Sequence, residues 1–145
     1  MPKAKRAAAG WAILLLILMQ FAPLGRLNPP APAPLKAPEP VQKALQNACY
    51  DCHSFETRWP RAAYVAPASW LIAGTIERGR RALNFSVWPA AGSAEEKVGA
   101  AAVLAVIPDA VGHQPLYYAA NPNRRPAIIE KEELTAWFGS LRNRQ

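Results

Sequence analysis

The pattern of apolar and charged positions divides the chain into three parts. No charged residue occurs from Ala7 to Leu24. This run of about 18 residues is close to the ~17–25 that a helix needs to cross the hydrocarbon core of a membrane. Basic residues precede it at Lys3, Lys5 and Arg6, which is typical of an N-terminus that stays in the cytoplasm. We therefore predict that residues 1–27 form a cytoplasmic basic tip and one transmembrane signal anchor in the inner membrane.

A cleavable signal peptide has the same basic start and apolar centre. No clean small-x-small cleavage site follows Met19, because Gln20 and Phe21 come next, and this favours an uncleaved anchor. In either case the rest of the chain is expected on the periplasmic side.

The next segment, residues 28–40, contains six prolines. This composition disfavours helix and favours extended polyproline II structure. We predict that the segment is a stiff spacer between the anchor and the domain that follows.

The remaining region, residues 41–145, has helical periodicity and no convincing strand alternation. Ser69 is a plausible N-cap for one helix, and Ser93 with Glu96 forms a capping-box pattern for the next. The segment 109–126 is rich in Gly, Pro and Asn and is expected to be a loop. The helices expected in this all-α domain span residues 41–53, 70–83, 93–106 and 130–141.

The residues with the most specific chemistry lie together in Cys49-Tyr50-Asp51-Cys52-His53. A C-x-x-C-H run is the attachment signature of a c-type haem. On one helical turn the two sulfurs reach the two vinyl groups, and the histidine supplies an axial ligand. A thioredoxin-type dithiol would need a strand–helix setting and no histidine. A zinc site would need two further ligands, but the chain has no other cysteine and only one other histidine.

The charge balance argues against a nucleic-acid partner. The 17 Lys and Arg residues exceed the 10 Asp and Glu residues, giving a net charge of +7. Four of the basic residues flank the apolar N-terminal run, and two haem propionates would offset part of the remainder. The high pI therefore reflects membrane topology more than a nucleic-acid surface.

Several segments together resemble the bacterial haem-binding domain family of small, membrane-anchored c-type cytochromes. The resemblance covers about residues 41–142 and implies one covalent haem c held by Cys49 and Cys52, with His53 as axial ligand. The matching segments are Asn47–Ser54, Trp59-Pro60, Pro67–Trp70, Gly79-Arg80 and Leu83–Trp88. Within them, the residues that we expect to contact the haem are Trp59, Pro67, Trp70, Arg80, Asn84 and Phe85.

The chain departs from the family pattern at the sixth coordination position. Family members usually carry a Met-Pro pair where this chain has Ile107-Pro108, and Asn121-Pro122 replaces a His-Pro pair. Both methionines, Met1 and Met19, lie in the predicted anchor. His113 is the only other histidine and is our prediction for the distal ligand. The alternatives are an open or water-bound iron, or an unusual donor such as Tyr117, Tyr118, Asn121 or a lysine.

The leading functional prediction is a membrane-tethered, mono-haem electron carrier and not an enzyme. It would exchange single electrons with membrane redox proteins, and one variant is a fixed haem subunit of a respiratory or photosynthetic complex. The lipid bilayer would be a second partner, through the N-terminal helix. The alternative is a peroxidase-like enzyme or small-gas sensor, which requires an open iron and distal acid–base groups. The predicted architecture is a cytochrome-c-like domain of about four short helices around the haem.

Overall fold

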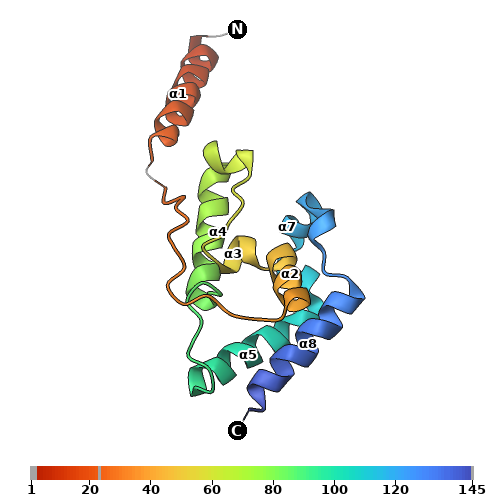
Figure 1. Ribbon diagram of the computed structural model, residues 1–145. Helices are drawn as coiled ribbons and strands as arrows, with labels where there is room; N and C mark the ends of the chain where they lie inside the picture. The colour runs from red at the N-terminus through yellow and green to blue at the C-terminus, as the bar shows by residue number, and fades with distance from the viewer. Residues whose placement is uncertain (1–2, 23, 145) are drawn as a thin grey trace.

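The computed structural model describes residues 3–22 and 24–144, and the regular secondary structure of this part of the chain consists of helices joined by irregular and extended segments (Figure 1). Outside the helices, the described residues contain one isolated bridge, between Ala33 and Val87. The all-helical expectation is confirmed. The α-helices are α1 (Lys3–Gln20), α2 (Glu39–Ala48), α3 (Tyr50–His53), α4 (Ala68–Ala82), α5 (Ala94–Val106), α6 (Ala110–His113), α7 (Pro115–Ala120) and α8 (Ile128–Arg142). Three 3₁₀ turns lie at η1 (Arg61–Tyr64), η2 (Ile107–Asp109) and η3 (Pro122–Arg124).

The prediction of a membrane-spanning N-terminal helix is wrong. No helix among the described residues combines the length and the apolar character that a bilayer crossing requires. Helix α1 ends at Gln20, and its uncharged part, residues 7–20, spans only roughly 21 Å at ~1.5 Å per residue. A hydrocarbon core is ~30 Å thick. The predicted single-pass placement in the inner membrane is wrong for the same reason. Residues 1, 2 and 23 of the predicted anchor lie outside the described residues.

The proline-rich segment lies along the domain. The amide groups of Ala33 and Leu35 donate to the carbonyls of Ser86 (3.2 Å) and Phe85 (2.8 Å), and Trp88 N–H donates to Ala33 O (2.7 Å). The Leu35 side chain is buried in the core. The extended backbone expected from the prolines is therefore used to pair with residues 85–88.

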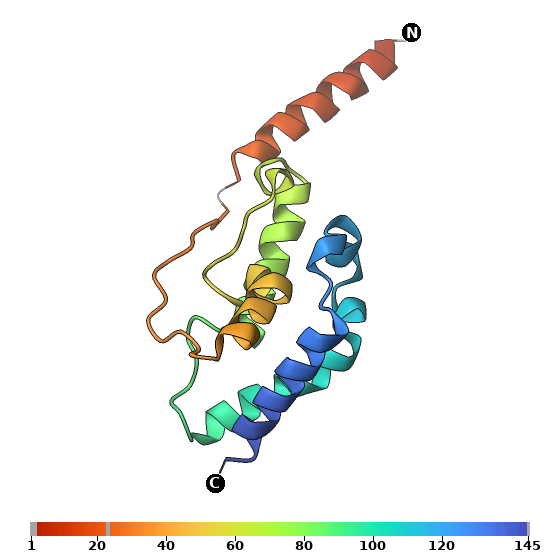
Figure 2. The same ribbon diagram turned by 45° about the vertical axis from the view of Figure 1, so that its right-hand side comes forward.

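Aromatic side chains fill the centre of the domain. Phe85 stacks on Tyr50 and Trp88, with ring centroids 5.5 Å and 5.6 Å apart. The Phe138 ring, which is fully buried, contacts both Phe85 and Trp88. Helices α5 and α8 lie side by side (Figures 1 and 2), and α2 packs against α8. The α5–α8 pair thus supports α2, and with it the start of the cysteine motif.

Two predicted helix starts differ in outcome. The Ser93 Oγ accepts a hydrogen bond from Glu96 N–H (3.0 Å), as expected for the N-cap of α5. The Glu96 carboxylate caps Gly92 N–H (2.7 Å) in return. The prediction of Ser69 as an N-cap is wrong: α4 begins at Ala68, and Pro67 occupies the N-cap position. Ser69 N–H already bonds to Val65 O (2.9 Å), and the residue is buried within the first turn.

The segment predicted as a loop, residues 109–126, is largely helical. It contains α6, α7 and η3, each only one or two turns long. Proline starts α7 and η3, and the Asp109 side chain accepts from Gly112 N–H (3.0 Å) to cap α6. Helix breakers in the sequence here mark the starts of short helices, where proline is well tolerated.

Helix α4 packs very closely on the segment that carries the second cysteine. A Cβ atom at Gly79 would lie 2.5 Å from the Cys52 carbonyl oxygen, which is closer than carbon and oxygen can approach without rearrangement. The glycine is therefore required by the distance between α4 and α3.

We predict that Gly79→Ala lowers the free energy of unfolding by about 1–3 kcal/mol, because the added methyl group pushes α4 away from α3. Gly139→Ala is the matched control, since a Cβ there meets no atom within 4 Å. In α8 this change should stabilise the protein by up to ~1 kcal/mol. Chemical denaturation of both variants measures the difference, and equal effects would contradict the close contact.

Candidate functional site

The cysteine motif lies where one helix ends and the next begins. The Cys49 N–H donates to Leu45 O (2.8 Å) and closes α2. The Cys49 carbonyl then accepts from Cys52 N–H (3.2 Å) and His53 N–H (3.0 Å), which makes the single turn of α3. A continuous helix over 41–53 was expected, and the structure shows a break at Cys49. Both cysteines and the histidine still lie on one turn.

The His53 ring is held in one orientation. Its Nδ1 lies 3.0 Å from the Leu83 carbonyl oxygen at the end of α4. Because a carbonyl only accepts hydrogen bonds, Nδ1 carries the proton and the lone pair of the neutral ring is on Nε2. Burial lowers the pKa of His53, which also favours the neutral ring. Metal-binding histidines commonly have such a hydrogen bond on the second nitrogen.

The two thiols do not have the properties of a redox dithiol. Burial raises the pKa of Cys49 to about 12 and that of Cys52 to about 11, and both cysteines are free. Reactive cysteines have lowered pKa values because the thiolate is the nucleophile. The thioredoxin-type alternative is therefore disfavoured.

The His113 ring lies close to the His53 ring. Their ring centroids are 6.1 Å apart and the ring planes differ by 25°. Two imidazoles that bind one metal ion from opposite sides, at ~2.0–2.1 Å per bond, have ring centroids roughly 6.2–6.4 Å apart. The structure thus brings together the two histidines of the chain, 60 positions apart in the sequence, at a spacing that suits one metal ion.

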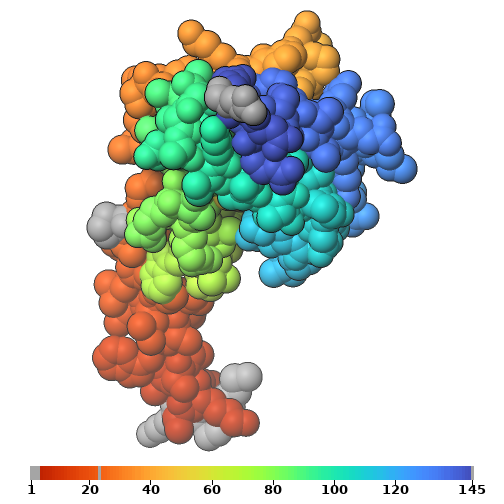
Figure 3. Space-filling view, turned by 90° about the horizontal axis from the view of Figure 1, so that it is seen from below, coloured from red at the N-terminus to blue at the C-terminus, as the bar shows by residue number. Residues whose placement is uncertain are grey.

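The composition of the site fits haem better than a bare metal ion. Among the described residues, no group of three or more His, Cys, Asp or Glu side chains is arranged to hold a metal. Two protein ligands are enough when a porphyrin supplies the other four nitrogens. In Figure 1, α3 lies between α4 on one side and α7 on the other. The space-filling view in Figure 3 shows a hollow in the surface. It lies between the yellow-green region around the start of α4 and the cyan region around α6.

Two adjacent tyrosines attach α7 to the cysteine motif. The Tyr118 hydroxyl donates to the Ala48 carbonyl (2.9 Å), and the Tyr117 hydroxyl donates to Asp51 Oδ2 (2.7 Å). Burial raises the pKa of both tyrosines, and the Asp51 contact raises that of Tyr117 further. Both hydroxyls are therefore protonated donors with partners of their own, which counts against either one as an axial ligand. Asn121 likewise donates its amide to Tyr117 O (3.0 Å).

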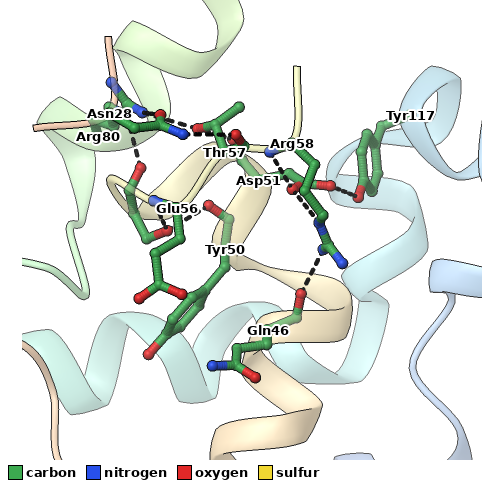
Figure 4. A network of polar contacts seen from close by, with 10 residues as sticks. Asn28, Gln46, Tyr50, Asp51, Glu56, Thr57, Arg58, Arg80 and Tyr117 are labelled. Carbon is green, nitrogen blue, oxygen red and sulfur yellow. Dashed lines mark hydrogen bonds and ion pairs between the residues drawn. The ribbon is translucent and has the colours of Figure 1, made fainter. Parts of the chain in front are cut away.

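Arg80, expected at the haem, is a hydrogen-bond centre for the loops around the motif. Its guanidinium donates to Ser54 O (2.8 Å), Thr57 Oγ1 (2.9 Å) and Asn28 Oδ1 (2.9 Å), as Figure 4 shows in part. The same group lies over the Phe55 and Trp59 rings. Arg80 thus joins α4, the segment after His53 and the proline-rich segment.

The other residues predicted to contact haem have different surroundings. Phe85 is in the core and its ring meets the His53 ring edge-on, with centroids 6.3 Å apart. Asn84 Oδ1 accepts from Ser86 N–H (2.9 Å) and shapes the turn after α4. Trp70 and Trp59 line a surface pocket together with Arg80, Ile76 and Leu24. Pro67 is exposed at the start of α4. Contact of these residues with haem stays a prediction.

Sequence reasoning missed the contacts that orient the site. The Leu83 carbonyl, the Gly79 contact and the Asp51–Tyr117 bond each join segments separated by more than 20 positions. The position of Asp51 inside the cysteine motif was visible, but nothing in the sequence pairs it with Tyr117.

The sequence profile of the haem-binding domain family matches residues 14–140 of this chain. No curated protein and no solved structure matches this chain. The match spans most of the chain, including both cysteines, both histidines and the helices that support them. The protein therefore belongs to the haem-binding domain family.

Proposed function

We propose that the protein is a mono-haem c-type cytochrome that carries single electrons. The observation that supports this most directly is the close pair of imidazoles, His53 and His113, of which His53 shares one helical turn with two half-buried cysteines. When bound, haem supplies a one-electron Fe(III)/Fe(II) couple whose potential is tuned by axial ligands and burial. The residues of this chain would hold it, orient it and restrict access to it.

Cys49 and Cys52 would attach the porphyrin. Each thiol S–H would add across a vinyl C=C bond, and this addition would form one C–S and one C–H bond without an oxidant or a leaving group. Since both thiols lie on the turn that ends in His53, attachment also fixes the proximal ligand beneath the ring. The Nδ1–H bond to Leu83 O holds the His53 ring with Nε2 free to coordinate.

His113 would be the distal ligand. Two imidazoles give a lower potential than a methionine–histidine pair, because imidazole stabilises ferric iron more than a thioether does. With both axial positions filled by the protein, exchange of electrons needs no bound substrate. The partner would be another redox protein.

An enzyme or gas sensor is the second candidate. The observation that favours it is that His113 is exposed, in a helix of four residues. If His113 leaves the iron, small ligands gain access. The described residues, however, contain no further histidine to act as a distal acid or base.

Covalent attachment predicts that the red colour stays with the protein after denaturation and extraction with acidic acetone. Replacing both Cys49 and Cys52 by Ala should release all colour into the solvent, while His113→Ala should retain it. Absorbance of the extract and the intact mass of the chain provide the measurement. Haem lost from the unaltered protein would contradict c-type attachment.

His113→Ala is predicted to convert a low-spin absorption spectrum into a high-spin one, because it removes the sixth ligand. The reduced variant should bind carbon monoxide promptly, whereas the unaltered protein should be inert on the same time scale. Gln114→Ala, at the neighbouring position, is the control and should keep the low-spin spectrum. A low-spin spectrum in His113→Ala would exclude this histidine as the ligand.

A further inference from the structure

The Asp51 side chain, one of the two between the cysteines, links the motif to the segment that follows His113. Asp51 Oδ2 accepts the Tyr117 hydroxyl (2.7 Å) from α7, and Figure 4 shows the two groups pointing toward each other. Its other oxygen, Oδ1, accepts from both the backbone N–H (3.0 Å) and the Nε (2.9 Å) of Arg58. Arg58 donates in turn to Gln46 O (2.6 Å) on α2. Arg58 thus fixes the Asp51 carboxylate through Oδ1, and Oδ2 accepts the hydrogen bond from Tyr117.

His113 is attached to the domain through its neighbours. Before it, Asp109 caps α6, and Lys131 of α8 donates to Pro108 O (3.0 Å). After it, α7 begins at Pro115, whose ring restricts the backbone. The first side chain of α7 that bonds to the cysteine motif is Tyr117, four positions from His113. The distance between His113 and His53 therefore depends on the docking of α7.

We propose that Tyr117 is a positioning residue that keeps His113 opposite His53, through its hydrogen bond to Asp51. The proposal rests on the proposed function, since it assumes that His113 is the distal ligand. Thioether bonds at Cys49 and Cys52 would fix Asp51 relative to the porphyrin. A bond from Asp51 to α7 then limits how far His113 can move away from the iron.

The two tyrosines of α7 have different roles in this arrangement. Tyr118 is buried and donates to a backbone carbonyl, that of Ala48, as part of the core packing. Tyr117 is half-buried and donates to a carboxylate. Hydrogen bonds to charged groups are stronger than neutral ones. Loss of the Tyr117 hydroxyl removes this bond while the aromatic ring and the Tyr118 contact remain.

The test uses the haem-loaded protein and titrates the ferric form with imidazole. An added ligand must compete with His113, so its apparent affinity rises in proportion to the fraction of molecules in which His113 is off the iron. Tyr117→Phe should raise the apparent affinity for imidazole by about 10-fold or more, the effect expected for a lost bond to a charged group. Tyr64→Phe makes the same chemical change in an exposed tyrosine of η1 and should leave the affinity unchanged.

The Asp51 side of the contact gives a second measurement. Asp51→Asn keeps an acceptor oxygen and should raise the affinity less than Asp51→Ala does. If the effect passes through this one contact, Tyr117→Phe adds little when Asp51 is already Ala. Full additivity of the two changes, or an imidazole affinity of Tyr117→Phe equal to that of the unaltered protein, would overturn the proposal.

The failure of this proposal can be told apart from the failure of the proposed function. If the unaltered protein is low-spin and Tyr117→Phe binds imidazole with the same affinity, only the positioning role of Tyr117 is excluded. An unaltered protein that is high-spin, or that binds carbon monoxide at once, shows that His113 is not the ligand and overturns both. A structural effect alone would lower the unfolding midpoint of Tyr117→Phe without changing its imidazole affinity, and that result also overturns the positioning role.

Discussion

The contact between α4 and the turn of α3 is the constraint on which the rest of the site depends. At Gly79 the helix approaches so closely that a single Cβ would collide with the Cys52 carbonyl. One turn later, Leu83 O accepts the Nδ1–H of His53, and Phe85 N–H then donates to His53 O (2.8 Å). These contacts fix α4 and the residues after it against the turn of α3. The thiols, the imidazole and the aromatic core therefore take up fixed relative positions.

The two sides of the proposed haem site are supported very differently. His53 is half-buried, lies on the attachment turn itself and has its second nitrogen bonded to the backbone. His113 is exposed and lies on a helix of four residues, joined to the motif through α7. In the proposed function, such a site would have a permanent proximal ligand and a distal ligand whose presence depends on tertiary docking. This asymmetry is the reason that we weigh both electron transfer and small-ligand binding as proposals for the same fold.

Features that depend on residues close together in the sequence could be predicted, whereas contacts between distant segments could not. Haem binding followed from the motif, and the α5 cap followed from Ser93, because both depend on residues a few positions apart. The membrane anchor was wrong because an uncharged run of residues was counted without knowing that its helix ends at Gln20. The short helices after Asp109 were missed because proline and glycine were taken only as breakers. The bond between Asp51 and Tyr117 joins residues 66 positions apart, and no local pattern reports it.

The central claim is that two imidazoles of this chain coordinate one haem iron. An electron paramagnetic resonance spectrum of the unaltered, oxidised protein, combined with its near-infrared absorption, reports spin state and axial ligands without any substitution. Our account predicts a single low-spin ferric species with two nitrogen ligands. A high-spin ferric signal, or a low-spin species with a ligand other than a second imidazole, would contradict it.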